Sequence, residues 1–320
     1  MVRRRAAALA LALFLVACTL PVASCGREAG EREPQGVARD IHGSLGYAGV
    51  ERSYLLHLPP SYDGEEELPL LFAFHGGGGD GAGMERLTHL SDVADERGFI
   101  VVYPDGIDKG WNDGRPEINP GVDDVGFVSA LIDELVSRYR VDAGRVYSTG
   151  ISNGGFFSFR LACELSEKVA AVAPVAALMG ENLSRTCAAP RPVAVMIVMG
   201  TEDPFVSWSG GEITAGRTRR GRWLSASDTV SFWVKADACS QSPSVSYDPD
   251  RSPHDGTRVR RETYAGGRDG TEVILLAVEG GGHTWPGGLQ YLREGAIGKT
   301  CRDMDAGEAI WDFLERHRLE

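Results

Sequence analysis

The stretch RVYSTGISNGGFFSFRLAC, Arg145–Cys163, decides the fold of this 320-residue chain. An apolar run leads into Gly150-Ile151-Ser152-Asn153-Gly154, and a segment rich in phenylalanine follows. This G-x-S-x-G pattern between a predicted strand and a predicted helix is typical of a turn that exposes a nucleophilic serine. The turn is so tight that its flanking residues must be small, and the helix N-terminus favours negative charge beside Ser152. We expect Ser152 to be a nucleophile; a glycine-rich turn without chemistry is the alternative.

The rest of the chain alternates strand-like and helix-like segments. Residues 125–140 carry apolar side chains every four positions, which predicts an amphipathic helix. An alternating run at Val50–Leu58 predicts a half-buried strand, and continuous apolar runs predict strands buried on both faces of a sheet. These runs are Leu68–Phe74, Phe99–Pro104, Arg145–Gly150, Val169–Ala176, Val193–Gly200 and Val273–Gly280. The expected fold class is α/β, with a mostly parallel central sheet and helices on both faces.

Composition and charge exclude some classes of protein. The chain is 42% hydrophobic and 24% charged, with a net charge of −12, as in ordinary globular proteins. Nucleic-acid binding is not expected, because phosphate recognition needs clustered Lys and Arg. The basic run at Gly216–Trp223 is interpreted as a solvated loop.

The N-terminus resembles an export signal rather than part of the fold. Three arginines precede an apolar core, residues 6–17, that is too short to span a membrane. Two sites of small residues plus cysteine follow, ending at Cys18 and Cys25, and both resemble lipoprotein processing sites. We expect a lipoprotein-type signal over residues 1–24, lipidation of Cys25, a flexible tether over 25–40 and one catalytic domain over 41–320. Cleavage without lipid, and processing at Cys18, stay open.

Export changes the interpretation of the remaining cysteines, Cys163, Cys187, Cys239 and Cys301. An even number in an oxidising compartment suggests two disulfides, for which three pairings exist. We favour Cys163–Cys187 and Cys239–Cys301, because each pair couples elements expected to be neighbours. A zinc site is the alternative, but the spacing of the cysteines does not support it.

A nucleophilic serine needs a base, and the base needs an orienting acid. In this architecture the chain order is serine, acid, histidine, each after a strand. His283, in VILLAVEGGGHTWPGG, follows the last predicted strand. Asp203, in GTEDPFV, follows a buried strand and is preferred to Glu202 because Asp-Pro fixes a turn. We therefore expect a catalytic set of Ser152, Asp203 and His283.

The glycine-rich stretch LPLLFAFHGGGGDGAG, Leu68–Gly83, also matches the dinucleotide fingerprint G-x-G-x-x-G. A strand already precedes it, and a cofactor would leave the serine, aspartate and histidine unexplained, so we expect no cofactor. A loop of free backbone N–H groups explains the glycines better, because ester cleavage passes through a negatively charged oxygen that such groups stabilise. We expect the N–H groups of Gly77 and Asn153 to form this oxyanion hole, with Gly76 as the alternate.

Three tryptophans near these loops are candidates for substrate contact: Trp111, Trp208 and Trp285. For each, packing within a loop is the alternative. No metal is expected, since the acidic stretch Asp248–Gly256 lacks the central glycine and closing glutamate of a calcium loop.

These motifs together resemble a known family. GWNDGR…VDDVGF, RVYSTGISNGG…LAC, GTEDPFV and GGGHTWPGG, in this order, are similar to the secreted polyhydroxybutyrate depolymerase and feruloyl or acetylxylan esterase-like group of α/β-hydrolases. The resemblance covers about Gly43 to Leu314. It implies carboxylic ester hydrolysis by Ser152, Asp203 and His283, with the oxyanion loop at His75-Gly76-Gly77.

Two departures from the family pattern bear on the substrate. Met199 stands where the family often has a histidine. We also expect no linker and no separate polymer-binding domain, which extracellular polymer depolymerases of the family usually carry. The expected partner is an ester, either a hydroxyalkanoate oligomer or an acylated polysaccharide fragment. Contact with a membrane is expected only through the N-terminal lipid. A serine peptidase on the same scaffold and a non-catalytic binding lipoprotein remain alternatives.

Overall fold

The structure is a computed structural model that describes residues 38–215 and 218–320, with side chains described outside 213–220. The predicted signal, the lipidation site Cys25 and most of the predicted tether lie outside the described residues. The predicted tether extended too far towards the C-terminus. Arg39 and Asp40 belong to strand β1 (Arg39–Tyr47), which pairs with the next strand along the chain.

Ten strands form one sheet, and their bounds are as follows. They are β1, β2 (Val50–Leu58), β3 (Leu68–Phe74), β4 (Ile100–Pro104), β5 (Val141–Ile151), β6 (Ala171–Val175), β7 (Ala194–Gly200), β10 (Ser244–Tyr247), β11 (Arg258–Tyr264) and β12 (Val273–Glu279). The strand order is β1-β2-β4-β3-β5-β6-β7-β12-β11-β10. The strands from β4 to β12 in this order are parallel, and the flanking strands pair antiparallel. The sheet is therefore mostly parallel, as predicted.

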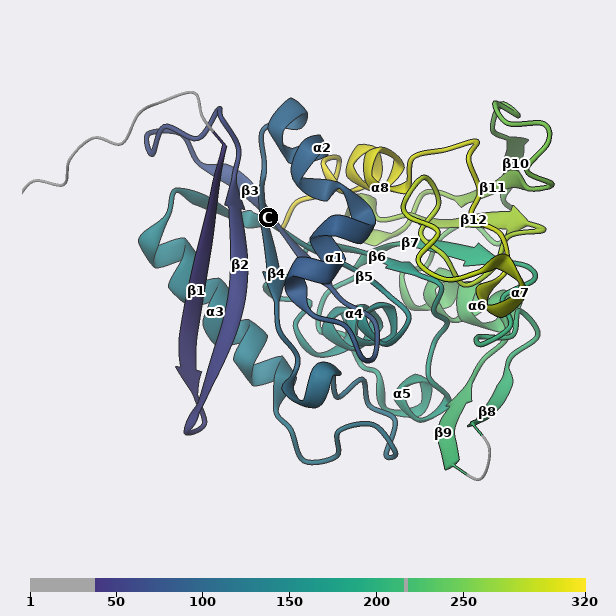
Figure 1. Cartoon of the computed structure of the whole chain (residues 1–320), viewed down its shortest axis with the longest axis horizontal. Coiled ribbons are helices and arrows are strands. Elements are labelled where there is room, and N and C mark those ends of the chain that lie inside the picture. The colour runs from purple at the N-terminus through teal and green to yellow at the C-terminus, as the bar shows by residue number, and fades with distance from the viewer. Residues whose placement is uncertain (1–37, 216–217) are drawn as a thin grey trace, which may run out of the picture. The chain divides into compact units, whose positions relative to one another are not determined.

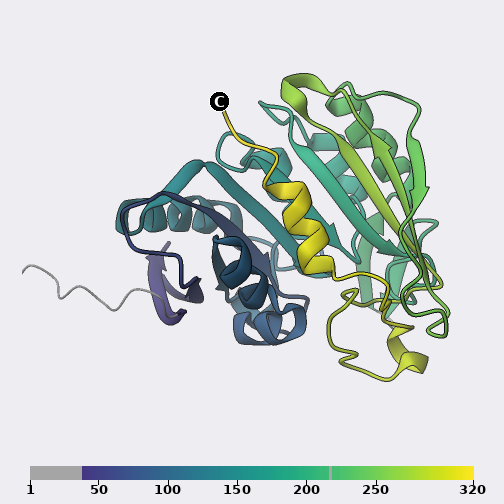
Figure 2. The same ribbon diagram turned by 90° about the horizontal axis from the view of Figure 1, so that it is seen from above.

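Helices cover both faces of the sheet (Figures 1 and 2). The helices are α1 (Gly81–Thr88), α2 (Leu90–Arg97), α3 (Asp124–Arg138), α4 (Asn153–Glu164), α5 (Glu181–Thr186), α6 (Ala226–Ala236), α7 (Glu294–Ile297) and α8 (Ala306–Leu314). Buried residues of α3, α4 and α6 belong to one hydrophobic core, and those of α1, α2 and α8 belong to another. Strand β3 shows how the sheet separates them, because Phe72 and Phe74 enter the first core while Leu71 and Ala73 enter the second.

The elements that the sequence did not predict lie away from the buried centre. Strand β1 alternates between half-buried and exposed residues, and every residue of β10 is exposed, so neither has a continuous apolar run. The basic run forms strand β9 (Thr218–Trp223), which pairs with β8 (Gly211–Ala215) in a hairpin. The interpretation of this run as a solvated loop was wrong for its backbone, because residues 218–223 form a strand of this hairpin.

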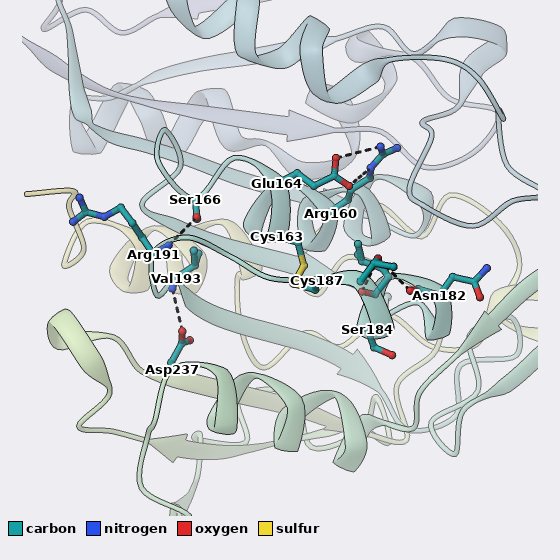
Figure 3. Close-up of a disulfide and its surroundings, with 12 residues drawn as sticks. Arg160, Cys163, Glu164, Ser166, Asn182, Ser184, Cys187, Arg191, Val193 and Asp237 are labelled. Atoms are coloured by element: carbon teal, nitrogen blue, oxygen red, sulfur yellow. Dashed lines mark hydrogen bonds and ion pairs between the residues drawn. A yellow bond between two sulfur atoms is a disulfide. The ribbon is translucent and has the colours of Figure 1, made fainter.

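One of the two predicted disulfides is present. Cys163, in the last turn of α4, is bonded to Cys187, directly after α5 (Figure 3). The predicted Cys239–Cys301 bond was wrong, since both are free, buried thiols. Cys239 lies in the core of α3, α4 and α6, whereas Cys301 lies in the core of α1, α2 and α8, so the sheet separates them.

Among the residues that the structure describes, none of the helices combines the length and apolar character needed to cross a bilayer.

A buried carboxylate closes helix α6. Asp237 is 1% exposed, and its Oδ1 accepts a hydrogen bond from the backbone N–H of Val193 at 3.2 Å (Figure 3). Its Oδ2 has no hydrogen-bond partner among the described residues. Burial raises the pKa of Asp237 to about 7, although the Val193 N–H and the charge of Arg268 oppose the increase. The folded protein therefore holds a proton that the unfolded chain releases near the ordinary pKa of 3.8.

The sign of the pH dependence follows from this raised pKa. As pH rises from about 4 towards 7, the unfolded state loses this proton first, so the contribution of Asp237 to stability falls. We expect Asp237→Asn to stabilise the protein by about 1–2 kcal/mol at pH 8, after the cost of an unpaired amide, and to have a smaller effect near pH 4.5.

Thermal unfolding at the two pH values measures this difference. Asp269→Asn, at an exposed position, is the control with the same change in charge. An equal effect of Asp237→Asn at both pH values would show that Asp237 does not titrate in this way.

Candidate active site

The turn between β5 and α4 places Ser152 in a strained backbone conformation. Its φ is 55° and its ψ is −120°, outside the regions that non-glycine residues normally occupy. Two glycines make the turn possible. A Cβ at Gly154 would lie 2.2 Å from the carbonyl oxygen of Phe74, and one at Gly150 would lie 2.6 Å from the carbonyl carbon of Gly154. The end of β3 therefore contacts the start of α4, and Ser152 is held at the turn.

Asp203 and His283 are joined although 80 residues separate them. Nδ1 of His283 lies 2.7 Å from Oδ2 of Asp203, and both side chains are buried. Oδ1 of Asp203 accepts hydrogen bonds from the backbone N–H groups of Phe205 and Val206. These bonds orient the carboxylate towards the imidazole. A carboxylate oxygen accepts, so His283 donates from Nδ1, and Nε2 has no described partner.

Ser152 and His283 line the same cavity, which has a volume of about 440 Å³. No hydrogen bond joins the two side chains among the described residues. Two residues of the cavity wall, Leu289 and Tyr291, were not predicted from the sequence. The Tyr291 hydroxyl donates a hydrogen bond to the carbonyl oxygen of His283. The remaining wall is mostly glycine and apolar: Gly76, Gly77, Gly78, Gly79, Gly83, Met84, Leu87 and Ile151, with His75, Asp80 and Arg86.

Phe205 also contacts the imidazole of His283, although it does not line the cavity and the sequence did not single it out. The ring of Phe205 packs edge-to-face against the imidazole, with 5.2 Å between ring centroids, and Phe205 is 45% exposed. Its position two residues after Asp203 was a usable signal, because a turn that aims the acid at the histidine also brings its next residues close to it.

The loop of glycines after β3 lies beside the serine turn. A Cβ at Gly76 would lie 3.5 Å from the Cβ of Ser152, and one at Gly77 would lie 3.9 Å from the Cβ of Asn153. The backbone N–H groups of Gly77 and Asn153 donate to no described acceptor. Two free N–H groups next to a serine can stabilise a negatively charged oxygen.

His75 holds this loop in place. Its Nε2 accepts a hydrogen bond from the N–H of Gly106, so its proton is on Nδ1, which donates to the carbonyl oxygen of Gly76 at 2.8 Å. Its own carbonyl oxygen accepts a bond from the Trp111 indole at 3.1 Å. Burial lowers the pKa of His75, although nearby acceptors oppose this. His75 is thus a neutral support for the glycine loop.

The side chain of Asn153 holds the start of α4. Its Oδ1 accepts from the N–H of Trp111 at 2.7 Å, and its Nδ2 donates to the carbonyl oxygen of Trp111 and to Asp113. Asp113 is in turn paired with Arg115. All of these groups are buried. The role of Asn153 is therefore wider than the predicted contribution of its N–H group.

A buried ion pair also supports the segment around Trp111. Arg52 in β2 and Asp124 at the start of α3 are 2.8 Å apart, with side chains 3% and 0% exposed. The second oxygen of Asp124 accepts from the N–H of Asn112 at 2.7 Å. The guanidinium of Arg52 also lies 4.0 Å from the ring centroid of Phe127. The adjacent Asp123 caps α3 by accepting a hydrogen bond from the N–H of Gly126, whereas Asp124 anchors the loop at Asn112.

Two of the three tryptophans predicted to contact substrate do not reach the surface. Trp111 and Trp285 are both 0% exposed, and each packs in a hydrophobic core, so the predictions for them were wrong. The physical reason for Trp111 is its stacking against Phe157 and its bond to His75. Trp208 is half-buried at the edge of the core and is not part of the cavity wall. A role for Trp208 in substrate binding stays a prediction.

Comparison with known proteins identifies the family. The profile described as "Esterase PHB depolymerase" matches residues 52–205. The relative "Putative esterase NocK" of Nocardia uniformis subsp. tsuyamanensis is 32% identical over 295 residues, covering 89% of this chain and 85% of its own length. The chain belongs to this family of esterases.

Other relatives agree. "Feruloyl esterase D" of Neurospora crassa is 28% identical, covering 85% of each chain. "Feruloyl esterase B" of Piromyces equi is 27% identical, covering 84% of this chain but 46% of its own length. The "Acetyl xylan esterase from Aspergillus awamori" has a TM-score of 0.55 at 14% identity, covering 88% of this chain and 99% of that one, and it supports the α/β-hydrolase fold. This chain is a carboxylic ester hydrolase with that fold.

The buried pair of Arg52 and Asp124 gives a test of what supports the site. We expect Arg52→Met to destabilise the protein by about 3–5 kcal/mol, because it leaves a buried carboxylate without its cation. The double variant Arg52→Met/Asp124→Leu removes both charges. Its free energy of unfolding is expected to fall less than that of Arg52→Met alone. Urea unfolding of the two variants and the wild type measures both losses. A double variant at least as unstable as the single one would show that the charge pairing does not dominate.

Proposed function

We propose that this esterase works through a triad of Ser152, His283 and Asp203. The supporting observation is the buried bond from His283 Nδ1 to Asp203, which leaves Nε2 as a base in the cavity that Ser152 also lines. The strained turn supports the nucleophilic role of Ser152, because such strain persists only where the surrounding structure enforces it.

In the proposed reaction His283 takes the proton of Ser152 as the hydroxyl oxygen attacks the ester carbonyl. The carbonyl oxygen becomes negative, and the N–H groups of Gly77 and Asn153 stabilise it. The intermediate collapses, and His283 returns the proton to the departing alcohol, which leaves an acyl group on Ser152. A water molecule, activated by His283, then attacks the acyl carbonyl and releases the acid. Asp203 keeps the imidazole oriented and stabilises its charged form throughout.

The size and lining of the cavity suit a small or extended apolar acyl group. Its wall combines glycines with Met84, Leu87, Leu289 and Tyr291, and its volume of about 440 Å³ lies in the range of small-ligand sites. The named relatives are feruloyl and acetylxylan esterases. For this chain we propose hydroxyalkanoate oligomers or acylated polysaccharide fragments. A panel of hydroxybutyrate oligomers, feruloyl esters and acetyl-xylan distinguishes these, and amide substrates test the peptidase alternative.

The proposed site of action is outside the cytoplasm. The signal-like residues 1–24 and the processing site at Cys25 support export with a lipid anchor, and the disulfide between Cys163 and Cys187 is consistent with an oxidising compartment.

Substitution of the triad tests the reaction. We expect Ser152→Ala to lower kcat on p-nitrophenyl acetate by at least about 10⁴-fold, because no other group supplies the attacking oxygen, and Asp203→Asn to lower it by about 10⁴-fold through the wrong histidine tautomer. Initial rates with correctly folded variants measure both effects.

Glu202→Gln is the matched control, since Glu202 is the adjacent exposed acid and has no bond to the histidine. Its rate should remain close to that of the wild type. Wild-type turnover in Ser152→Ala would reject the triad, and a large loss in Glu202→Gln with none in Asp203→Asn would move the acid to Glu202.

A further inference from the structure

A second cluster of reactive side chains lies apart from the cavity. Asp255, Cys301 and Asp303 each offer one possible ligand atom, and these atoms all lie within 4.8 Å of one another. Cys301 and Asp303 are buried, whereas Asp255 is half-buried and gives the cluster a route to solvent. None of the three lines the cavity that holds Ser152.

Asp303 has an oxygen that the rest of the fold leaves without a partner. The residue is 3% exposed, and its Oδ1 accepts hydrogen bonds from the N–H groups of Arg251 and Ser252 at 2.9 and 2.8 Å. Its Oδ2 is buried and has no hydrogen-bond partner among the described residues. A buried carboxylate oxygen is costly unless a donor or a cation meets it. The unpartnered Oδ2 of Asp303 is therefore free to accept a hydrogen bond or to bind a cation.

The neighbouring carboxylate, Asp255, is held in place by hydrogen bonds. Asp255 accepts hydrogen bonds from the N–H of Arg302 at 2.8 Å and from the N–H and hydroxyl of Thr257. Among the described residues, no Lys or Arg side chain forms an ion pair with Asp255 or Asp303. The cluster thus brings acceptors together without a bonded cation.

We propose that Asp255, Cys301 and Asp303 bind a thiophilic divalent cation, of which Zn²⁺ is the representative. Zinc accepts one thiolate and two carboxylate oxygens, at about 2.3 Å and about 2.0–2.2 Å, and takes water in a fourth position. Calcium and magnesium prefer oxygen ligands alone, so the sulfur of Cys301 disfavours them. Binding exchanges the thiol proton of Cys301 for the metal and releases that proton to solvent.

The sequence could not indicate this site. The stretch Asp248–Gly256 lacks a calcium-loop pattern, and that absence led to the expectation of no metal. The proposed ligands come instead from two segments 46 residues apart, which the fold brings together. Such a ligand set leaves no contiguous motif.

The site would brace the loop that carries His283. The carbonyl oxygen of Lys299 accepts a bond from the N–H of Gly282 at 2.9 Å, and a Cβ at Gly280 would lie 2.4 Å from the carbonyl oxygen of Gly256. The segments that provide the ligands therefore pack directly against residues 280–282. The metal is expected to raise the stability of the folded protein rather than to enter the ester chemistry.

Titration with metal tests the proposal. The full chain is treated with a chelator, and Zn²⁺ binding is measured by calorimetry, while Co²⁺ is followed through its thiolate charge-transfer absorption. We expect one ion per chain, a higher unfolding temperature with Zn²⁺, no charge-transfer band in Cys301→Ser, and binding weakened at least about tenfold in Asp303→Asn. Cys239→Ser is the matched control, because Cys239 is the other buried free thiol, and it should keep the band.

Retained ester hydrolysis shows that each variant is folded. If a variant does not fold, Asp255→Asn, at the half-buried ligand, is used in its place. The proposal is overturned if the folded wild type binds neither Zn²⁺ nor Co²⁺. It is also overturned if the band persists in Cys301→Ser or is lost in Cys239→Ser. Neither result would affect the proposed triad, which is tested by turnover alone.

Discussion

The structure of the site depends on the close packing of helix α4 against the end of strand β3. The backbone of Gly154 meets the carbonyl oxygen of Phe74 at a distance that leaves no space for a side chain. This contact forces the chain to turn sharply at Ser152, in a conformation that a serine does not adopt freely. It also brings the loop that follows Phe74 next to the serine turn, so that Gly76 lies beside Ser152 and Gly77 beside Asn153. One steric constraint thus assembles the nucleophile and the free N–H groups.

The rest of the site is held by polar groups that are buried and paired. Asn153 fixes the segment around Trp111 by hydrogen bonds in both directions, and the ion pair of Arg52 and Asp124 holds the next residue of that segment. On the other side, Asp203 is oriented by two backbone N–H groups before it meets His283. Buried hydrogen bonds of this kind restrict the side chains that they join, although Nε of Arg52 has no hydrogen-bond partner among the described residues. Such rigidity suits a site whose N–H groups must already point at the charge that develops in the transition state.

The sequence predicted what depends on local pattern. Continuous apolar runs marked the buried parallel strands, and the glycines around Ser152 marked the turn, because both leave a signal within a few residues. Edge strands such as β1 and β10 were missed, since half-exposed strands have no such run. The pairing of Cys239 with Cys301 was wrong because spacing does not tell which face of a sheet a residue occupies. Trp111 and Trp285 were misassigned, and Arg52 overlooked, because burial and contacts between distant segments arise only in the folded chain.

The most direct test of this account is a crystal structure of the protein inhibited by a p-nitrophenyl phosphonate, whose tetrahedral phosphorus mimics the ester intermediate. We expect the phosphorus to be bonded to the oxygen of Ser152, with its free oxygen about 2.7–3.1 Å from the backbone nitrogens of Gly77 and Asn153. A phosphonate attached to another residue, or one whose free oxygen points away from both nitrogens, would contradict the account.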